Sequence, residues 1–414
     1  MFTLCLHMKG ASTCRVSIVT FERRDRIGRG KMTTNRLASV EELGLNPGKV
    51  EELLNRVQKE VDEGLLPSVQ VALARNGRVG VFESYGSAEP ESLICLFSAT
   101  KAITSAAAWL LIQDGKLHED EIVAAIVPEF GTNEKDQVTV QQLFAHTAGF
   151  PSAPFAPLDW VDKDRRYGRF AQWRLNWQPG TRFEYHPTAT MWVIAEIIER
   201  KSGESFTDFV RTRVTEPLGL ADLIVGLPAG DNARALDVEY SGDPLTAEDY
   251  AKLGMPEPPV TEVTEEALLR FNRPDIRAVG VPGGGGYANA FDMALFYQAL
   301  LHGGLEGTEL WSDATRSNVR EIRSGDLADP MFGMLANRGL GIIISGDDTR
   351  NFRGFGATNS PSAFGHNGAG GQLCWVDPAT GLSLAYLTSG HDRNNVRQGR
   401  RGVSISSIAA ECAL

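Results

Sequence analysis

The sequence predicts an α+β fold in which an antiparallel sheet is built from both ends of the chain. Two apolar, β-rich runs near the N-terminus are joined by Asn76-Gly77, a dipeptide typical of tight hairpin turns. Similar runs return near the C-terminus, and the long stretch between them has mainly helical patterns. We therefore expect helices to flank the sheet, an inserted and mainly helical lobe, and a cleft between the two lobes.

The elements follow from hydrophobic spacing. Residues 47–64 carry apolar side chains at helical intervals, so we expect an amphipathic helix there. Strands are expected at 69–74 and 79–82, and again near the C-terminus at 339–345, 372–376 and 382–388. The expected helices after the first are 101–114, 139–146, 190–202, 205–214, 290–302 and 403–412.

The chain divides into a short extension and one large domain. Residues 1–40 form a basic extension, because the first 31 residues hold seven Lys or Arg against two acids. It lacks the apolar core and cleavage site of a secretory signal, and we expect it to be unstructured or spurious, with a transit peptide as the alternative. The domain then covers 41–414, with a sheet lobe of about 41–115 plus 335–414 and a helical lobe of about 116–334.

Composition excludes several classes of function. The net charge of −11 and the lack of a basic patch with interleaved aromatic residues argue against a nucleic-acid partner. No apolar run is long enough to predict a membrane span. The five cysteines form no C-x-x-C pair, which favours free thiols in a reducing compartment and hence a cytoplasmic protein. No two of the seven histidines have metal-ligand spacing, so we expect no metal.

Ser98 and Lys101 form an S-x-x-K pattern at the start of the expected helix 101–114. Three residues is just under one helical turn, so the hydroxyl and the ammonium would lie on the same face. A serine hydroxyl needs a nearby base to become a nucleophile, and a partly desolvated lysine can be that base. The alternative is a helix-capping serine followed by a solvated lysine.

Four stretches together resemble the serine β-lactamase and penicillin-recognising superfamily, in particular its class C-like branch with family VIII-like carboxylesterases. They are residues 97–101, 138–149, 177–185 and 364–371, in the family's order and approximate spacing. The resemblance covers nearly everything from Val50 to Ser389. It implies the β-lactamase/transpeptidase-like fold, and a serine hydrolase domain without a cofactor.

The resemblance also implies roles for individual residues. Ser98 would be the acyl-accepting nucleophile, Lys101 its activating partner, and Tyr185 the group that takes and returns the proton. The backbone N–H groups of Ser98 and Ala369 would form the oxyanion hole. His366 and Gly368 would line the substrate strand. The alternatives are an ordinary half-buried tyrosine at 185 and a buried histidine satisfied by backbone at 366.

Three further residues lie near these stretches. Tyr287 ends a glycine-rich turn, 281–287, and is expected to point into the pocket, while His186 beside Tyr185 is expected to contact substrate. His146 is expected to tie together the turn at 149–151 rather than to take part in catalysis.

Two departures from the family pattern indicate the substrate. Pro187 occupies the position of an asparagine whose amide holds the substrate in β-lactamases, and proline offers neither a side-chain amide nor a backbone N–H. His366 replaces a lysine that helps to bind the carboxylate of β-lactams, and a histidine is largely neutral near pH 7. Both changes favour neutral, apolar acyl groups and therefore esters. The aromatic residues of 155–177 could form an acyl pocket or lid, or simply pack the helical lobe.

The sequence therefore predicts a serine carboxylesterase that cleaves a small-molecule ester through an acyl-enzyme on Ser98. The alternatives within the fold are an acyltransferase, a D-aminopeptidase and a β-lactamase. The alternative of another class is a non-catalytic binding or scaffold protein, against which the complete Ser98, Lys101 and Tyr185 set argues. The sequence leaves the physiological ester and the oligomeric state open.

Overall fold

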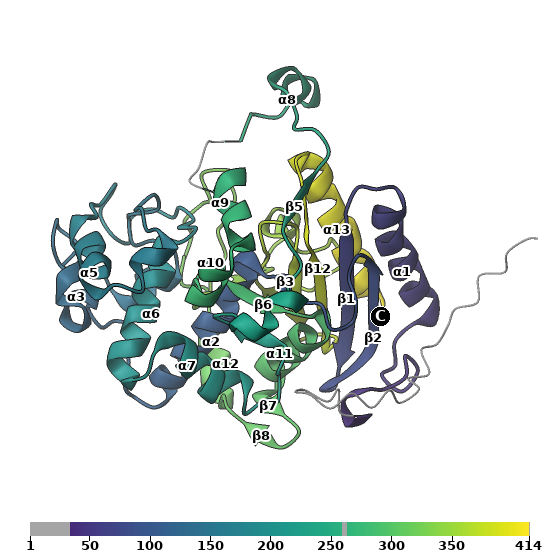
Figure 1. Cartoon of the computed structure of the whole chain (residues 1–414), viewed down its shortest axis with the longest axis horizontal. Coiled ribbons are helices and arrows are strands. Elements are labelled where there is room, and N and C mark those ends of the chain that lie inside the picture. Colours follow the sequence, from purple (N-terminus) through teal and green to yellow (C-terminus); the bar gives the residue numbers. More distant parts are fainter. Residues whose placement is uncertain (1–33, 259–262, 414) are drawn as a thin grey trace, which may run out of the picture.

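The computed structural model describes residues 34–258 and 263–413 and confirms the predicted α+β fold (Figure 1). Its main sheet has six strands in the order β2-β1-β12-β11-β10-β9, and every neighbouring pair is antiparallel. The strands are β1 (Ser68–Arg75), β2 (Arg78–Gly86), β9 (Ile343–Ile344), β10 (Phe364–Gly365), β11 (Leu373–Asp377) and β12 (Leu382–Thr388). Strands from both ends of the chain therefore meet at the centre of the sheet, where β1 pairs with β12.

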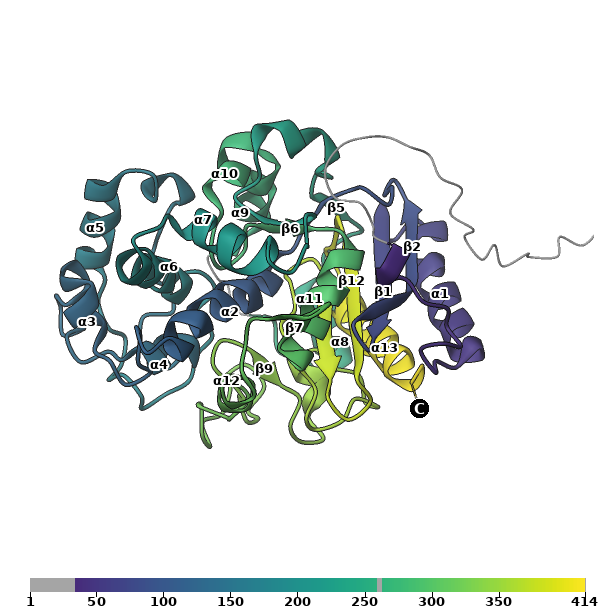
Figure 2. The same cartoon turned by 90° about the horizontal axis from the view of Figure 1, so that it is seen from below.

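Helices cover both faces of this sheet, and the alternation of side chains along β1 explains why. Val69, Val71 and Leu73 belong to the core beneath α1 (Pro47–Asp62) and α13 (Asn395–Glu411). Ala72 and Ala74 point the other way, into the core that holds α11 (Ala290–His302). Figures 1 and 2 show α1 and α13 side by side on one face and α11 on the other.

The helical lobe is built around α2 (Thr100–Gln113), in which 12 of 14 residues are buried. α2 packs against α6 (Ala189–Ser202), and α6 in turn against α4 (Val140–Phe144). A helix that is apolar on all sides must be enclosed by protein, so α2 forms the spine of this lobe. The remaining helices are α3 (Val123–Ile126), α5 (Lys163–Gln172), α7 (Phe206–Val210), α8 (Ala247–Leu253), α9 (Glu265–Leu269), α10 (Pro274–Val279) and α12 (Asp313–Val319).

Three small sheets complete the fold. One has the strand order β3-β6-β4, formed by β3 (Ile94–Cys95), β6 (Gly286–Ala288) and β4 (Leu223–Val225). The second is the parallel pair of β5 (Glu239–Ser241) and β13 (Gly390–Asp392), and the third is the hairpin of β7 (Gly304–Leu305) and β8 (Thr308–Glu309). Of this sheet, β3 lies directly before Ser98 in the chain, and its pairing with β6 supports the segment that carries Ser98.

Several predicted boundaries were wrong. The expected strand 339–345 forms strand only at β9, and α13 begins well before the expected helix 403–412. α2 belongs to the helical lobe rather than the sheet lobe, whereas α11 packs on the main sheet. The expectation for residues 1–33 lies outside the described residues, but 34–40 belong to the fold. Arg36 is buried and donates to the carbonyls of Leu218 and Gly219, and Ala38 N–H bonds to Val79.

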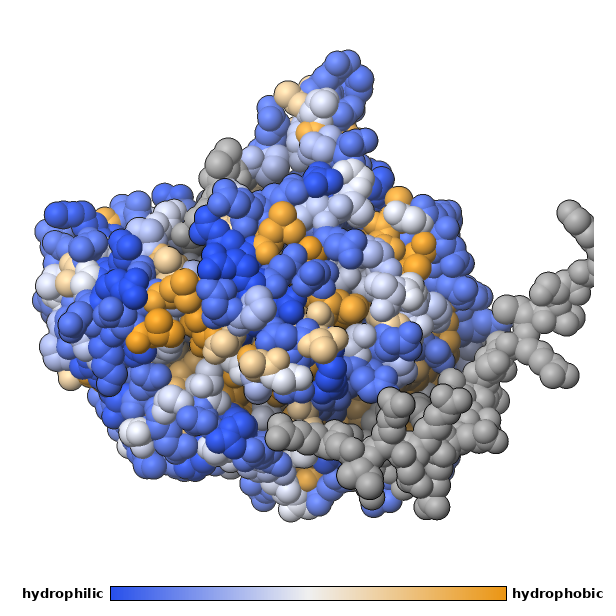
Figure 3. Space-filling view, viewed as in Figure 1, coloured by the Kyte–Doolittle hydropathy of each residue, from blue (hydrophilic) through white to orange (hydrophobic). Residues whose placement is uncertain are grey.

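The face seen in Figure 3 is mainly hydrophilic, with separate apolar patches. Within 34–258 and 263–413, the structure contains no helix that is both long and apolar enough to cross a bilayer.

Candidate active site

Ser98 lies in a single 3₁₀ turn, residues Phe97–Ala99, between β3 and the start of α2. Phe97 has a φ of 45°, an unfavourable value for a residue with a Cβ. Its buried ring packs against Phe271 and His391, with ring centroids 5.6 and 5.7 Å away, and this packing holds the turn. The backbone therefore reverses sharply just before α2 and leaves the Ser98 side chain partly accessible.

The Lys101 side chain is completely buried and reaches back to Ser98. Its Nζ donates to Ser98 Oγ at 3.2 Å. The same ammonium donates to the carbonyls of Pro187 at 2.7 Å and Gly283 at 2.8 Å. These two carbonyls come from segments far apart in the chain, and together they fix the position of the ammonium next to the serine hydroxyl. The alternative of a solvated lysine is therefore wrong, because the Lys101 side chain is buried.

Tyr185 completes the triad from the segment before α6. Its hydroxyl donates to Ser98 Oγ at 3.0 Å, and Lys101 Nζ lies 5.1 Å from the centre of its ring. Ser98 Oγ thus touches both groups that could take its proton, within the range expected for a nucleophile and its base.

The segment His366–Ala369 continues β10 and passes directly beside the Ser98 turn. A Cβ on Gly368 would lie 2.4 Å from the Leu96 carbonyl oxygen, so only glycine permits this approach. Gln372 strengthens the same contact, because its side-chain amide donates to the carbonyls of Cys95 at 3.1 Å and Thr388 at 3.0 Å. The half-buried Ala369 therefore lies in a segment that is clamped against the Ser98 turn.

A family model described as Beta-lactamase matches residues 53–405. The chain belongs to the beta-lactamase family. A curated relative from Escherichia coli strain K12, named "Putative D-alanyl-D-alanine carboxypeptidase", is 24% identical over an alignment of 385 residues that covers 85% of each protein. A solved penicillin-binding protein homologue from Caulobacter crescentus has 26% identity and a TM-score of 0.72, covering 88% of this chain and 98% of its own. A solved family VIII carboxylesterase has 25% identity and a TM-score of 0.71, with the same two coverages.

In this beta-lactamase-family chain, His366 is buried and neutral. Burial, and after it the positive charges of Lys101 and Arg338, hold the pKa of His366 well below its usual value. Its Nδ1 lies 2.9 Å from the Asn367 carbonyl, so Nδ1 carries the proton and donates there. Its Nε2 has no hydrogen-bond partner among the described residues.

The other two histidines of the site serve the local structure. His186 is fully buried, accepts the Phe150 N–H at Nε2 (3.0 Å) and donates from Nδ1 to the Glu184 carbonyl (2.7 Å). Because both nitrogens are used, the structure gives His186 no contact to offer a substrate. His146, with a φ of 57°, accepts the backbone N–H of His186 at its Nδ1. His146 was expected to tie together the turn at 149–151, but the imidazole that bonds to Phe150 in that turn is the one of His186.

Tyr287 does not point into the site. Its side chain is fully buried, and its hydroxyl donates to the Phe271 carbonyl at 2.8 Å. The expectation failed because the glycine-rich turn before it places β6 inside the β3-β6-β4 sheet rather than at the rim of a cleft.

The aromatic residues of 155–177 mainly pack the helical lobe. Phe155 stacks on Trp192 of α6 with ring centroids 4.5 Å apart, and Trp160 lies 5.1 Å from the same ring. Phe170 and Trp173 are buried in the same core. The structure therefore favours the packing alternative over an acyl pocket or lid.

Sequence reasoning missed two residues, Gln372 and Arg338. Gln372 lies just before the buried strand β11, and its side-chain amide donates to the Cys95 carbonyl, which is far away in the chain. The guanidinium of Arg338 lies 5.3 Å from the centre of the Tyr185 ring. Neither residue belongs to a motif with a chemical meaning, so no local signal could have found them.

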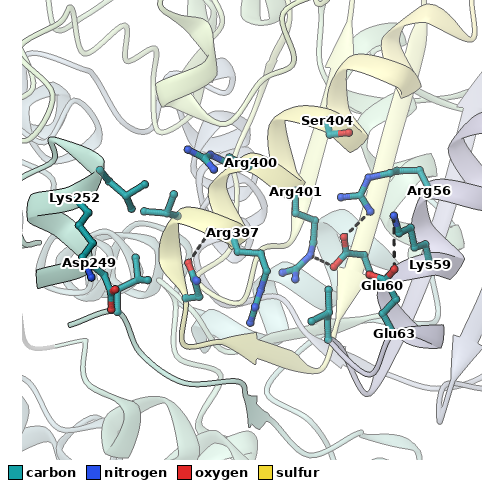
Figure 4. A pocket seen from close by; sticks show the side chains of 15 residues that line it. Arg56, Lys59, Glu60, Glu63, Asp249, Lys252, Arg397, Arg400, Arg401 and Ser404 are labelled. Carbon is teal, nitrogen blue, oxygen red and sulfur yellow. Dashed lines mark hydrogen bonds and ion pairs between the residues drawn. The ribbon is translucent and has the colours of Figure 1, made fainter.

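A cavity of about 780 Å³ lies elsewhere, among charged residues of α1, α8 and α13 (Figure 4). None of Ser98, Lys101 and Tyr185 lines it. Its lining has six basic and three acidic side chains, and the buried Glu60 pairs with both Arg56 and Arg401. We interpret this network as the ionic contact between α1 and α13.

The described part of the chain holds no cluster of three or more His, Cys, Asp or Glu side chains able to bind a metal ion.

Proposed function

We propose that this protein is a serine carboxylesterase that works through an acyl-enzyme on Ser98. The observation that carries the proposal is the position of Ser98 Oγ, 3.2 Å from Lys101 Nζ and 3.0 Å from the Tyr185 hydroxyl. A scaffold protein has no need to bury a lysine against a serine hydroxyl, since burying an ammonium is unfavourable unless it is used and well hydrogen-bonded.

The reaction has two halves. Lys101 and Tyr185 together take the Ser98 proton, Oγ attacks the ester carbonyl carbon, and the N–H groups of Ser98 and Ala369 bind the oxyanion. The bond from carbon to the leaving oxygen then breaks, and Tyr185 returns the proton to that oxygen to release an alcohol. Water next adds to the acyl-enzyme, so that the carboxylic acid leaves and Ser98 regains its proton.

The preference for esters is supported by the two positions, Pro187 and His366, at which the sequence differs from the family pattern. Pro187 uses its carbonyl to hold Lys101 and has no side-chain amide to offer a substrate. His366 is neutral because it is buried, so it supplies no positive charge to the carboxylate of a β-lactam.

Cys95, Cys374 and Cys412 are free thiols, which supports the proposed cytoplasmic location.

A substrate panel tests the proposal. We expect p-nitrophenyl butyrate to be hydrolysed faster than nitrocefin or a D-alanyl-D-alanine peptide, and Ser98→Ala to abolish turnover of all of them without unfolding the protein. A fluorophosphonate should form an adduct on Ser98 that is visible by mass spectrometry. Unchanged turnover in Ser98→Ala would end the mechanism, and a clear preference for nitrocefin would refute the ester assignment.

A further inference from the structure

Ala369 lies in a tight turn whose residues permit two backbone orientations. The Gly371 N–H donates to the Gly368 carbonyl at 3.1 Å, so residues 368–371 form a β-turn with Ala369 and Gly370 at its centre. Neither central residue has a positive φ, which fits a type I turn. Glycine at the third position also permits type II, in which the peptide between Ala369 and Gly370 is turned over. The turn sequence therefore allows both orientations, and only one is observed.

Gln398, near the start of α13, holds this peptide in the observed orientation. Its side-chain Nε2 donates to the Ala369 carbonyl at 3.1 Å. Gly371 lies against the same side chain, since a Cβ on Gly371 would be 3.4 Å from Gln398 Cγ. Turning the peptide over would point the Ala369 carbonyl away from this donor, so the hydrogen bond favours the type I form.

This end of α13 is itself fixed by ion pairs. Arg397 donates to the buried carboxylate of Asp392 through both Nε and Nη2, each at 2.7 Å. Arg401 joins the same carboxylate to Glu60 of α1, and Figure 4 shows the contact between Arg401 and Glu60. Gln398 therefore extends from a helical segment that is anchored at both neighbouring turns.

The strand before α13 also supports the Ser98 turn. His391 precedes Asp392 in β13, and its ring lies 5.7 Å from the ring of Phe97, the residue before Ser98. The His391 ring also stacks on Tyr240, with centroids 4.8 Å apart and planes 5° apart. The two segments that would supply the oxyanion hole, Ser98 and Ala369, are thus both supported by residues of 391–398.

We propose that Gln398 is a positioning residue for the oxyanion hole, which fixes the peptide between Ala369 and Gly370 and thereby the direction of the Ala369 N–H. The carbonyl and the N–H of Ala369 share one Cα, so restraining the first restricts the second. This inference rests on the proposed esterase function and deepens it. An oxyanion hole accelerates the reaction because its donors are already oriented when negative charge develops on the substrate oxygen. Gln398 acts through Ala369 and not on the substrate itself.

The test replaces the amide by an alkyl group of similar size, Gln398→Leu. We expect kcat for p-nitrophenyl butyrate to fall about 10- to 100-fold while KM changes less than about threefold, since a small displacement of a catalytic group has an effect of this size. The matched control is Gln113→Leu, which also removes a side-chain amide that donates to a backbone carbonyl, that of Leu310 at 2.9 Å. Gln113 ends α2, at the opposite end of that helix from Ser98, so kcat should stay within about twofold of wild type. Urea unfolding of both variants verifies that they are folded.

A transition-state analogue separates the oxyanion hole from a general loss of structure. The carbonyl carbon of a trifluoromethyl ketone bonds reversibly to Ser98 Oγ, the serine proton passes to the Lys101 and Tyr185 pair, and the ketone oxygen becomes an anion in the place of the oxyanion. Its inhibition constant should rise in Gln398→Leu by the same factor as kcat/KM falls, and should stay unchanged in Gln113→Leu. An unchanged inhibition constant in Gln398→Leu, or a kcat within about twofold of wild type, would overturn the proposal.

Failure of the esterase function itself looks different from failure of this inference. The wild-type protein would then leave p-nitrophenyl butyrate intact and Ser98 unlabelled by the fluorophosphonate. If only the role of Gln398 is wrong, the wild-type protein hydrolyses the ester and Gln398→Leu does so equally well.

Discussion

The Tyr185→Phe substitution isolates the proton relay from the packing of the site. Within the part of the chain that the structure describes, the hydroxyl makes one hydrogen bond, which it donates to Ser98 Oγ at 3.0 Å. The ring has many more contacts: its centroid lies 4.7 Å from that of His146 and 6.1 Å from that of His366. Phenylalanine keeps these ring contacts and loses only the hydroxyl, so a change in turnover reports on chemistry.

The two expected effects differ greatly in size. A positioned acid–base group contributes about 100- to 10,000-fold to rate, which corresponds to about 2.7–5.4 kcal/mol of barrier. The loss of one hydrogen bond at a half-buried hydroxyl lowers the free energy of unfolding by about 0.5–1.5 kcal/mol. Tyr185→Phe should therefore remain folded and lose at least 99% of its kcat/KM, roughly the lower end of that range.

The assay compares kcat/KM for p-nitrophenyl butyrate with urea unfolding of the same samples. Tyr287→Phe is the matched control, since it also removes one tyrosine hydroxyl, here bonded to the Phe271 carbonyl in the core. We expect it to lower the free energy of unfolding by about 1–3 kcal/mol, because a buried carbonyl loses its donor, and to leave turnover within about twofold. A Tyr185→Phe enzyme within about threefold of wild type would refute the relay, and so would equal losses of turnover in the two variants.

Three further predictions concern the rest of the site. Lys101→Met should abolish ester hydrolysis at least as completely as Tyr185→Phe. It should also lower the free energy of unfolding by about 1–3 kcal/mol, because the carbonyls of Pro187 and Gly283 lose their donor. Steady-state kinetics and urea unfolding measure the two effects, and retained turnover would contradict the role assigned to Lys101. Gly368→Ala should reduce kcat by about 100- to 1,000-fold, since the new Cβ would push the Ala369 segment away from the Leu96 carbonyl. Its control is Gly399→Ala, where a Cβ meets no atom within 4 Å, and equal kinetics in the two variants would argue against the oxyanion assignment. Burial lowers the pKa of His186 to about 4, so the folded state stays neutral while the unfolded chain binds a proton below about 6.5. The free energy of unfolding should therefore fall by about 2 kcal/mol between pH 7 and pH 5 because of His186. Urea unfolding at both pH values should show this extra loss in the wild-type protein relative to His186→Gln. If the free energy of unfolding depends on pH in the same way in both proteins, the prediction is wrong.

Local features of the chain were predictable from the sequence because short-range geometry decides them. Asn76 and Gly77 have φ values of 55° and 72°, as a two-residue hairpin turn requires. The helix after Ser98 begins at Thr100, one residue from its expected start. Ser98, Lys101 and Tyr185 meet as the family resemblance implied.

Other features depended on long-range packing and were missed or wrong. Apolar spacing predicted a strand at 339–345, but the chain pairs with β10 only at Ile343–Ile344. Tyr287 and His186 are adjacent to motifs yet bury their polar atoms in internal hydrogen bonds. Sequence spacing gives no information on which backbone group a side chain will meet after the lobes pack together.

The sequence by itself determined the α+β class and the pairing of the serine with its lysine, since each depends on residues close together in the chain. Only the tertiary structure decided what surrounds that pair. It buries Lys101 against the carbonyls of Pro187 and Gly283, and it brings the guanidinium of Arg338 to 5.3 Å from the centre of the Tyr185 ring. The physical reason is that burial and charge at one point are set by segments that meet only in the folded chain.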